Sequence, residues 1–112
     1  MANRPLLLLT TTALAATIAL SLPSNAASGP IERACNASSR SASTPRLCDC
    51  IQQVANVRLS NRQDQRLAAT FFATPHKAQD IRQSDRSSHE AFWLRYKAFA
   101  ETAELSCKAA AG

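Results

Sequence analysis

The chemistry most evident in this chain belongs to two cysteines one residue apart, Cys48 and Cys50. Closely spaced cysteines can exchange disulfides, and a thiolate near the start of a helix is more acidic and more reactive. Redox motifs of the thioredoxin kind hold two residues between their cysteines in a strand–helix context, which this sequence lacks. Because Cys35 and Cys107 are available as partners, we expect four structural cysteines. A thiol–disulfide role for Cys48 and Cys50 stays an alternative.

A metal site is the second chemistry that these residues suggest, because thiolates and imidazoles suit zinc or copper. Its ligands would be Cys48, Cys50 and Cys107, with His76 or His89. Zinc-ribbon spacing is missing, however, and both histidines fall in predicted turns or first helical turns, where a solvated role is usual. We therefore expect no metal and no other cofactor, and metal handling by the paired cysteines remains part of the same alternative.

Motifs of hydrolytic or phosphate chemistry are absent from the sequence. It contains no Gly-x-Ser-x-Gly, no His-Glu-x-x-His and no glycine-rich phosphate loop, which are the patterns that position a nucleophile, a metal or a phosphate. Its only glycines are Gly29 and Gly112. The sequence therefore predicts that the protein is not an enzyme.

Basic residues suggest a first interaction surface. Arg58, Arg62 and Arg66 recur every four residues and would form a stripe along a continuous helix. Ser60 lies between them and is expected to start a new helix. We predict an exposed basic surface at these arginines, facing an envelope or protein partner.

Acidic residues of the last predicted helix suggest a second surface. Glu90, Glu101 and Glu104, with Trp93 nearby, could hold a cationic ligand through carboxylates and an aromatic face. Lysines are interleaved with these glutamates, which favours an ordinary solvated face.

The first 26 residues are typical of a cleaved secretory signal. A short basic start contains Arg4, an apolar stretch follows from 6 to 22, and small residues end the segment at 24–26. We expect the mature chain to begin at Ala27, to lie in the periplasm or to be secreted, and to have no membrane span. It keeps twelve of the thirteen basic residues and all eight acidic ones, a net charge of +4. No nucleic-acid-binding pattern accompanies that charge, so nucleic acid is not an expected partner.

The mature part divides into three segments. Residues 27–43 are rich in Ser, Ala and Arg and lack apolar periodicity, which predicts an irregular arm. Residues 44–108 are predicted to form the helical domain, and 109–112 a frayed tail. Nothing in the mature part has the alternation of a strand, so we predict an all-α fold, a small disulfide-stapled bundle of about four helices.

Four helices are expected in the domain. The first begins at Pro45 with Thr44 as its cap, and it places Leu47, Ile51 and Val54 on one face, with polar residues including Gln52 opposite. The second opens with a capping box from Ser60 and ends at residue 74. A short third helix is expected to start with Pro75 and to turn Ala78 and Ile81 inward. The longest helix is expected to open with a capping box of Ser87 and Glu90 and to run from 87 to about 107. Its apolar stripe consists of Phe92, Tyr96, Phe99, Ala103 and Cys107.

Helical geometry also favours one disulfide pairing. Cys48 and Cys50 project on opposite sides of the apolar seam of their helix, so each should bond to a different partner. Cys50 lies nearer the centre of that seam, and Cys107 lies on the apolar stripe of the last helix. We favour Cys50 with Cys107 and Cys35 with Cys48, and the swapped pairing remains open.

Four stretches give the chain a resemblance to a family of small exported four-cysteine bacterial proteins. They are Leu-Cys-Asp-Cys-Ile-Gln-Gln-Val-Ala at 47–55, Ala-Ala-Thr-Phe-Phe at 68–72, Pro-His-Lys-Ala-Gln at 75–79 and Phe-Trp-Leu-Arg-Tyr at 92–96. The likeness covers most of residues 35–107. Some members carry the label "arginine transporter", which implies a role in uptake of a basic amino acid, but the resemblance supplies no catalytic or binding residues.

These observations support a principal hypothesis and two alternatives. We expect a small exported, disulfide-stabilised, non-enzymatic helical protein that serves as an envelope or protein-interaction module. The first alternative is an accessory or binding component for uptake of a basic amino acid such as arginine. The second is the thiol–disulfide or metal-handling role of the two closely spaced cysteines.

Overall fold

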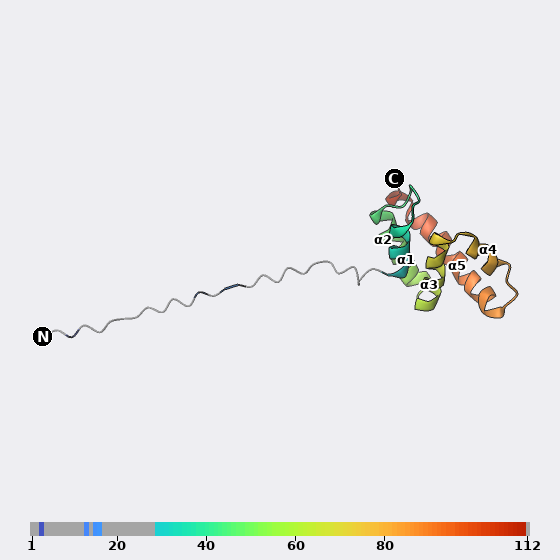
Figure 1. Ribbon diagram of the computed structural model, residues 1–112, viewed down its shortest axis with the longest axis horizontal. Coiled ribbons are helices and arrows are strands. Elements are labelled where there is room, and N and C mark those ends of the chain that lie inside the picture. Colours follow the sequence, from blue (N-terminus) through green and yellow to red (C-terminus); the bar gives the residue numbers. More distant parts are fainter. Residues whose placement is uncertain (1–2, 4–12, 14, 17–28, 112) are drawn as a thin grey trace.

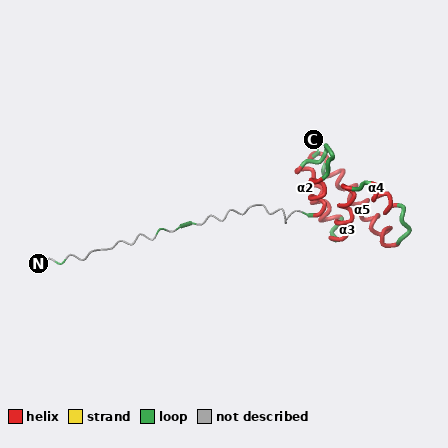
Figure 2. Tube along the Cα trace, in the orientation of Figure 1, coloured by secondary structure: helices red, strands yellow, loops and turns green. Residues whose placement is uncertain are grey.

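The computed structural model describes residues 29–111 and four isolated residues at 3, 13, 15 and 16. The expected signal peptide thus falls outside the described residues, apart from those four positions. The described part is all helical, contains no strand and is joined by short loops (Figures 1 and 2). Its elements are α1 (Pro30–Ala37), α2 (Pro45–Arg58), α3 (Arg62–Ala73), α4 (His76–Arg82), α5 (Ser87–Ser106) and a final 3-10 turn, η2 (Lys108–Ala110). Within this part of the chain, none of the helices combines the length and apolar character needed to cross a lipid bilayer.

Helix α1 corrects the prediction of an irregular arm for residues 30–37, whereas residues 38–43 contain no helix and residues 27–28 lie outside the described part. Pro30 is the first helical residue, where a missing N–H has no intrahelical partner to lose. The helix has eight residues, and Ile31 and Cys35, one turn apart, are both almost fully buried. Two buried apolar positions give too little periodicity to be recognised in the sequence, whereas their burial against other helices stabilises the turn in the folded protein.

The cap of α2 is the residue that the sequence predicted, whereas the cap of α3 is a different one. The Thr44 hydroxyl accepts a hydrogen bond from the Leu47 amide at 3.2 Å, as predicted. At α3 the cap is Asn61, whose side-chain oxygen accepts from the Gln63 amide at 2.8 Å. The predicted cap at Ser60 is therefore wrong by one residue, and α3 begins at 62 because the amide side chain of Asn61 satisfies its first free N–H groups.

The later helices follow the sequence more closely. Helix α4 begins at His76, one residue after the predicted start, and buries Ile81 as predicted. Helix α5 has no side-chain cap at its start, so the capping box expected from Ser87 is not formed. At its other end the chain continues into η2 through Ala110, which corrects the prediction of a frayed tail at 109–112 for the residues that the structure describes.

The helices pack around one core that α5 crosses from end to end. Helix α1 contacts α2 and α3, α2 contacts α5, and α4 contacts α3 and α5. Figure 1 shows α1, α2 and the C-terminus at one end of the domain, and α4 with the first turns of α5 at the other. The core consists of Ile31, Ala55, Leu59, Ala68, Phe71, Ile81, Phe92, Phe99 and Ala103.

Two disulfides link the elements, in the pairing that helical geometry favoured. Cys35 of α1 is bonded to Cys48 of α2, with 5.5 Å between their Cα atoms. Cys50 of α2 is bonded to Cys107 at the end of α5, with 5.8 Å between their Cα atoms. Helix α2 is therefore fixed covalently to both its neighbours, and the two closely spaced cysteines bond in different directions.

Candidate functional site

An apolar pocket opens where all five α-helices meet. Its volume is about 250 Å³. Helix α3 contributes Phe71 and Phe72, α5 contributes Tyr96 and Phe99, and Arg40 reaches the pocket from the loop between α1 and α2. The other residues of its wall are apolar: Ile31, Ile51, Ala68, Pro75, Ala78 and Ala103. Concave apolar sites with few polar groups are the usual form of a small-molecule site, so this pocket is the candidate functional site.

Aromatic rings from α3 and α5 form one wall of the pocket. The Tyr96 ring lies edge-on to Phe71, with ring centroids 5.1 Å apart, and its centroid is 5.9 Å from that of Phe99. Tyr96 also contacts Phe92 and Trp93 behind it, at centroid distances of 5.8 and 5.2 Å. Because aromatic pairs of this geometry attract each other beyond the effect of burial, the wall has a defined shape.

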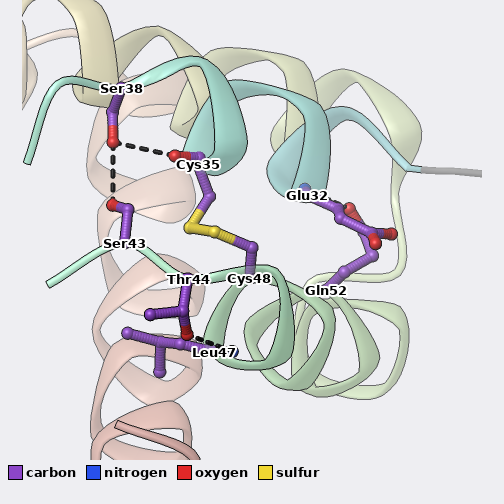
Figure 3. Close-up of a disulfide and its surroundings, with 8 residues drawn as sticks. All are labelled: Glu32, Cys35, Ser38, Ser43, Thr44, Leu47, Cys48 and Gln52. Carbon is purple, nitrogen blue, oxygen red and sulfur yellow. Dashed lines mark hydrogen bonds between the residues drawn. A yellow bond between two sulfur atoms is a disulfide. The ribbon is translucent and has the colours of Figure 1, made fainter.

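Arg40, the cation at the rim of the pocket, lies in the short loop between α1 and α2, which a disulfide joins. The Ser38 hydroxyl donates to the Cys35 carbonyl and lies 2.8 Å from the Ser43 hydroxyl, while Cys35 is bonded to Cys48 (Figure 3). This loop carries Arg40, whose guanidinium carbon is 5.9 Å from the centroid of the Phe72 ring. A cation over an aromatic face at this distance is attracted to it, so Arg40 is directed toward the pocket.

The electrostatics of the pocket are set by Arg40 and Tyr96. Arg40 is the only formally charged residue among those that line it. Burial raises the pKa of the Tyr96 phenol above its ordinary value, and the positive charge of Arg40 partly offsets that rise. Tyr96 therefore stays protonated at neutral pH and keeps an O–H that can donate a hydrogen bond near the Arg40 cation.

A second, polar hollow of about 200 Å³ lies on the other side of α2, where α1 meets α2 and α3. Gln52, only 3% exposed, accepts a hydrogen bond from the Glu32 amide at 2.9 Å and donates to the Gln65 side chain at 2.9 Å. Gln52 also donates to Asn56 at 2.9 Å. Gln52 thus caps the first turn of α1 from another helix (Figure 3).

The burial of Gln52 corrects the prediction that it lies on the polar face of its helix. Its side chain fills the space beside Gly29, where a Cβ would collide with the Gln52 amide. The error has the same origin as the missed helix, because the partner that covers Gln52 is α1. The amides of this hollow pair with one another and with the α1 backbone, which indicates a structural role for it.

All four cysteines are in disulfides, and the part of the chain described here contains no free thiol. Cys48 and Cys50 are not bonded to each other, as a redox-active pair would be. Over residues 29–111 and the four isolated positions, no group of three or more His, Cys, Asp or Glu side chains is arranged to hold a metal ion.

The three arginines of the predicted basic surface are exposed, but they do not share one helix. Arg58 is the last residue of α2, and Arg62 is the first residue of α3, with Arg66 one turn further along it. Arg62 also borders the polar hollow. The stripe is therefore divided by the turn at 59–61, as Ser60 suggested.

The predicted acidic face does not converge on a single site. Glu90, Glu101 and Glu104 are all exposed on α5. Eleven residues separate Glu90 from Glu101, which corresponds to about 16 Å along a helix, too far to share one small cation. Trp93 packs against Tyr96 and the core.

The sequence did not indicate the roles of two charged residues, Arg40 at the pocket and Arg95 in an ion pair. Arg40 was assigned to the irregular arm, and no local pattern marks it as a pocket residue. Arg95 of α5 pairs in two-pronged fashion with Asp64 in the first turn of α3, at 2.7 and 3.1 Å. The helical spacing of Phe71, Tyr96 and Phe99, by contrast, predicts that they face the core, and the structure shows that these rings also line the pocket.

Comparison with protein-family models, with curated proteins and with solved structures finds no match for this chain. The site is therefore interpreted from its own residues.

Proposed function

We propose that this protein is an exported, non-enzymatic binding module whose working site is the aromatic pocket. The observation that carries the proposal is an open apolar pocket with a single cation at its rim, lined by five helices of which α1, α2 and α5 are linked by disulfides. Fixed walls lower the entropy lost when a ligand or a partner side chain is bound. The pocket needs no cofactor for this role.

The disulfides support the exported part of the proposal. Two disulfides use all four cysteines of the chain, and such bonds persist in oxidising compartments and are rare in reducing ones. A periplasmic or secreted location fits this chemistry and the signal-like first 26 residues. The net charge and the exposed Arg58, Arg62 and Arg66 are compatible with contact to an envelope or protein partner of opposite charge.

Binding of a basic amino acid such as arginine is the competing proposal, and charge opposes it. The one formal charge of the pocket is positive, and the carboxylates of α5 are too widely spaced to replace it. Calorimetric titration with L-arginine separates the two proposals, because we expect no heat of binding at millimolar ligand. A saturable heat that Arg40→Gln left unchanged would favour the competing role.

The pocket itself is tested by filling it. We expect benzyl alcohol, a neutral probe of suitable size, to shift backbone amide resonances of the pocket walls in ¹⁵N–¹H spectra. Ala78 of α4 lines the pocket and is partly buried, so Ala78→Phe should abolish these shifts. Ala91→Phe, at an exposed position of α5 outside the pocket, serves as the matched control. Shifts of equal size in the Ala78→Phe protein, with an unchanged melting temperature, would contradict the proposal.

A further inference from the structure

The pocket is chemically asymmetric, with an apolar aromatic interior and one cation at its rim. We propose that it receives a small organic carboxylate, whose apolar body contacts Phe71 and Phe99 and whose carboxylate pairs with Arg40. This inference rests on the proposed function and names the ligand class for the same site. Its ligand would be an anion, whereas a site for a basic amino acid binds a cationic side chain.

The volume of the pocket limits the size of the ligand. An engineered apolar cavity of roughly 150 Å³ holds one benzene molecule, and this pocket offers about 250 Å³. The difference leaves room for a short side arm in addition to a ring. A phenylacetate-sized acid, or a medium-chain aliphatic acid of similar bulk, fits this space.

The charge of the rim selects the head group. Arg40 has no carboxylate within ion-pair distance among residues 29–111, where the ion pair found is Arg95 with Asp64. Its guanidinium is positioned over the Phe72 ring, and its planar array of N–H donors matches a carboxylate in a two-pronged geometry. No acidic residue lines the pocket, so a carboxylate entering it meets no repulsion from the wall.

Tyr96, which also lines the pocket, supplies a second donor. Burial raises the pKa of its phenol, and the positive charge of Arg40 offsets that rise only in part, so the phenol stays protonated at neutral pH. An O–H donor in the same pocket as a guanidinium can also donate to a bound carboxylate. The wall thus combines one charged donor and one neutral donor above an apolar interior.

Three probes with the same ring test the inference: phenylacetate, the neutral phenylacetamide and the cationic phenethylamine. Binding is followed by amide chemical shifts and by the fluorescence of Trp93, the single tryptophan, whose ring centroid is 5.2 Å from that of Tyr96. We expect phenylacetate to bind at least about tenfold more tightly than phenylacetamide, because one charge-assisted hydrogen bond contributes that much. Phenethylamine should bind the most weakly.

Variants of Arg40 test whether this residue causes the preference for phenylacetate over phenylacetamide. Arg40→Gln should lower phenylacetate affinity to that of phenylacetamide and leave phenylacetamide unchanged, whereas Arg40→Lys should keep part of the preference. Arg46→Gln is the matched control, since Arg46 is exposed at the start of α2 and does not line the pocket. Added salt should weaken phenylacetate binding to the wild-type protein.

The outcomes separate this inference from the proposal beneath it. Equal affinity for phenylacetate and phenylacetamide, or a preference that survives Arg40→Gln, would overturn the carboxylate inference and leave a pocket that binds neutral ligands. Tightest binding of phenethylamine would overturn it in favour of amines. Failure of all three probes and of benzyl alcohol to shift any pocket resonance would overturn both.

Discussion

The two ends of the domain are held together by different kinds of interaction. At one end, α1, α2 and the last turn of α5 are joined by two disulfides and by the hydrogen bond from the Glu32 amide to the Gln52 side chain. At the other end, α3, α4 and the first half of α5 are held by aromatic rings, notably Phe71, Phe92 and Tyr96. No disulfide reaches that second end. The candidate pocket lies between the two, with Arg40 from the stapled end and the rings from the aromatic end.

The difference follows from the amount of apolar surface that each end can bury. Helix α1 has eight residues and is too short to be stable alone. It buries Ile31 and Cys35 against neighbours, and a covalent bond and a hydrogen-bonded amide supply the rest of its attachment. Helix α3 and the first half of α5 carry large rings whose packing holds them without a disulfide. Small domains commonly combine these two solutions.

The largest effect is expected from removing the disulfide that closes the longer loop. Cys50 and Cys107 are separated by 57 residues, and Cys35 and Cys48 by 13. Each disulfide lowers the conformational entropy of the unfolded chain. Removing the longer and the shorter loop closure should therefore lower the free energy of unfolding by about 4 kcal/mol and about 3 kcal/mol. Urea unfolding of the Cys50→Ala/Cys107→Ala and Cys35→Ala/Cys48→Ala proteins measures both. Comparable stability of either variant and the wild type would show that the stapled end does not depend on its covalent bonds.

A somewhat smaller loss is expected at the aromatic end. Phe71 is 6% exposed and contacts both Phe92 and Tyr96. Phe71→Ala should lower the free energy of unfolding by about 3 kcal/mol, the lower end of the usual range, because one side of the ring already faces the open pocket. Phe72→Ala, at a half-buried rim position, is the control and should cost less. Urea unfolding measures both losses. Equal losses of stability in Phe71→Ala and Phe72→Ala would mean that the ring at the rim supports the fold as much as the buried ring.

The smallest of the three effects is expected from the buried amide. Gln52→Leu keeps the approximate size of the side chain but removes the acceptor of the Glu32 N–H and the donor to Gln65 Oε1. An unsatisfied buried polar group costs about 1 to 3 kcal/mol, so we expect the free energy of unfolding to fall by about 2 kcal/mol. Gln53→Leu changes an exposed neighbour and should have little effect. Hydrogen exchange of the α1 amides should accelerate in the first variant only.

Most of the helical framework was predictable from the sequence because its signals are local. Proline at the first helical position, threonine at a cap and apolar residues at helical spacing act within one or two turns, which is why α2, α3, α4 and α5 are where the sequence placed them to within a residue or two. The same periodicity put Cys50 and Cys107 on facing stripes, and thereby favoured the disulfide pairing that the structure contains.

Tertiary structure alone decided the features on which the site depends. Helix α1 forms because Ile31 and Cys35 are covered by other helices, and Gln52 is buried because α1 covers it, 20 residues away in the chain. Arg40 faces the pocket because the loop that carries it is closed between α1 and α2. The sequence determined which residues can form helices and which cysteines can face each other, since both depend on the backbone's own repeat. Which polar side chains are buried, and which cation stands over the aromatic wall, depend on contacts between distant segments that no local pattern encodes.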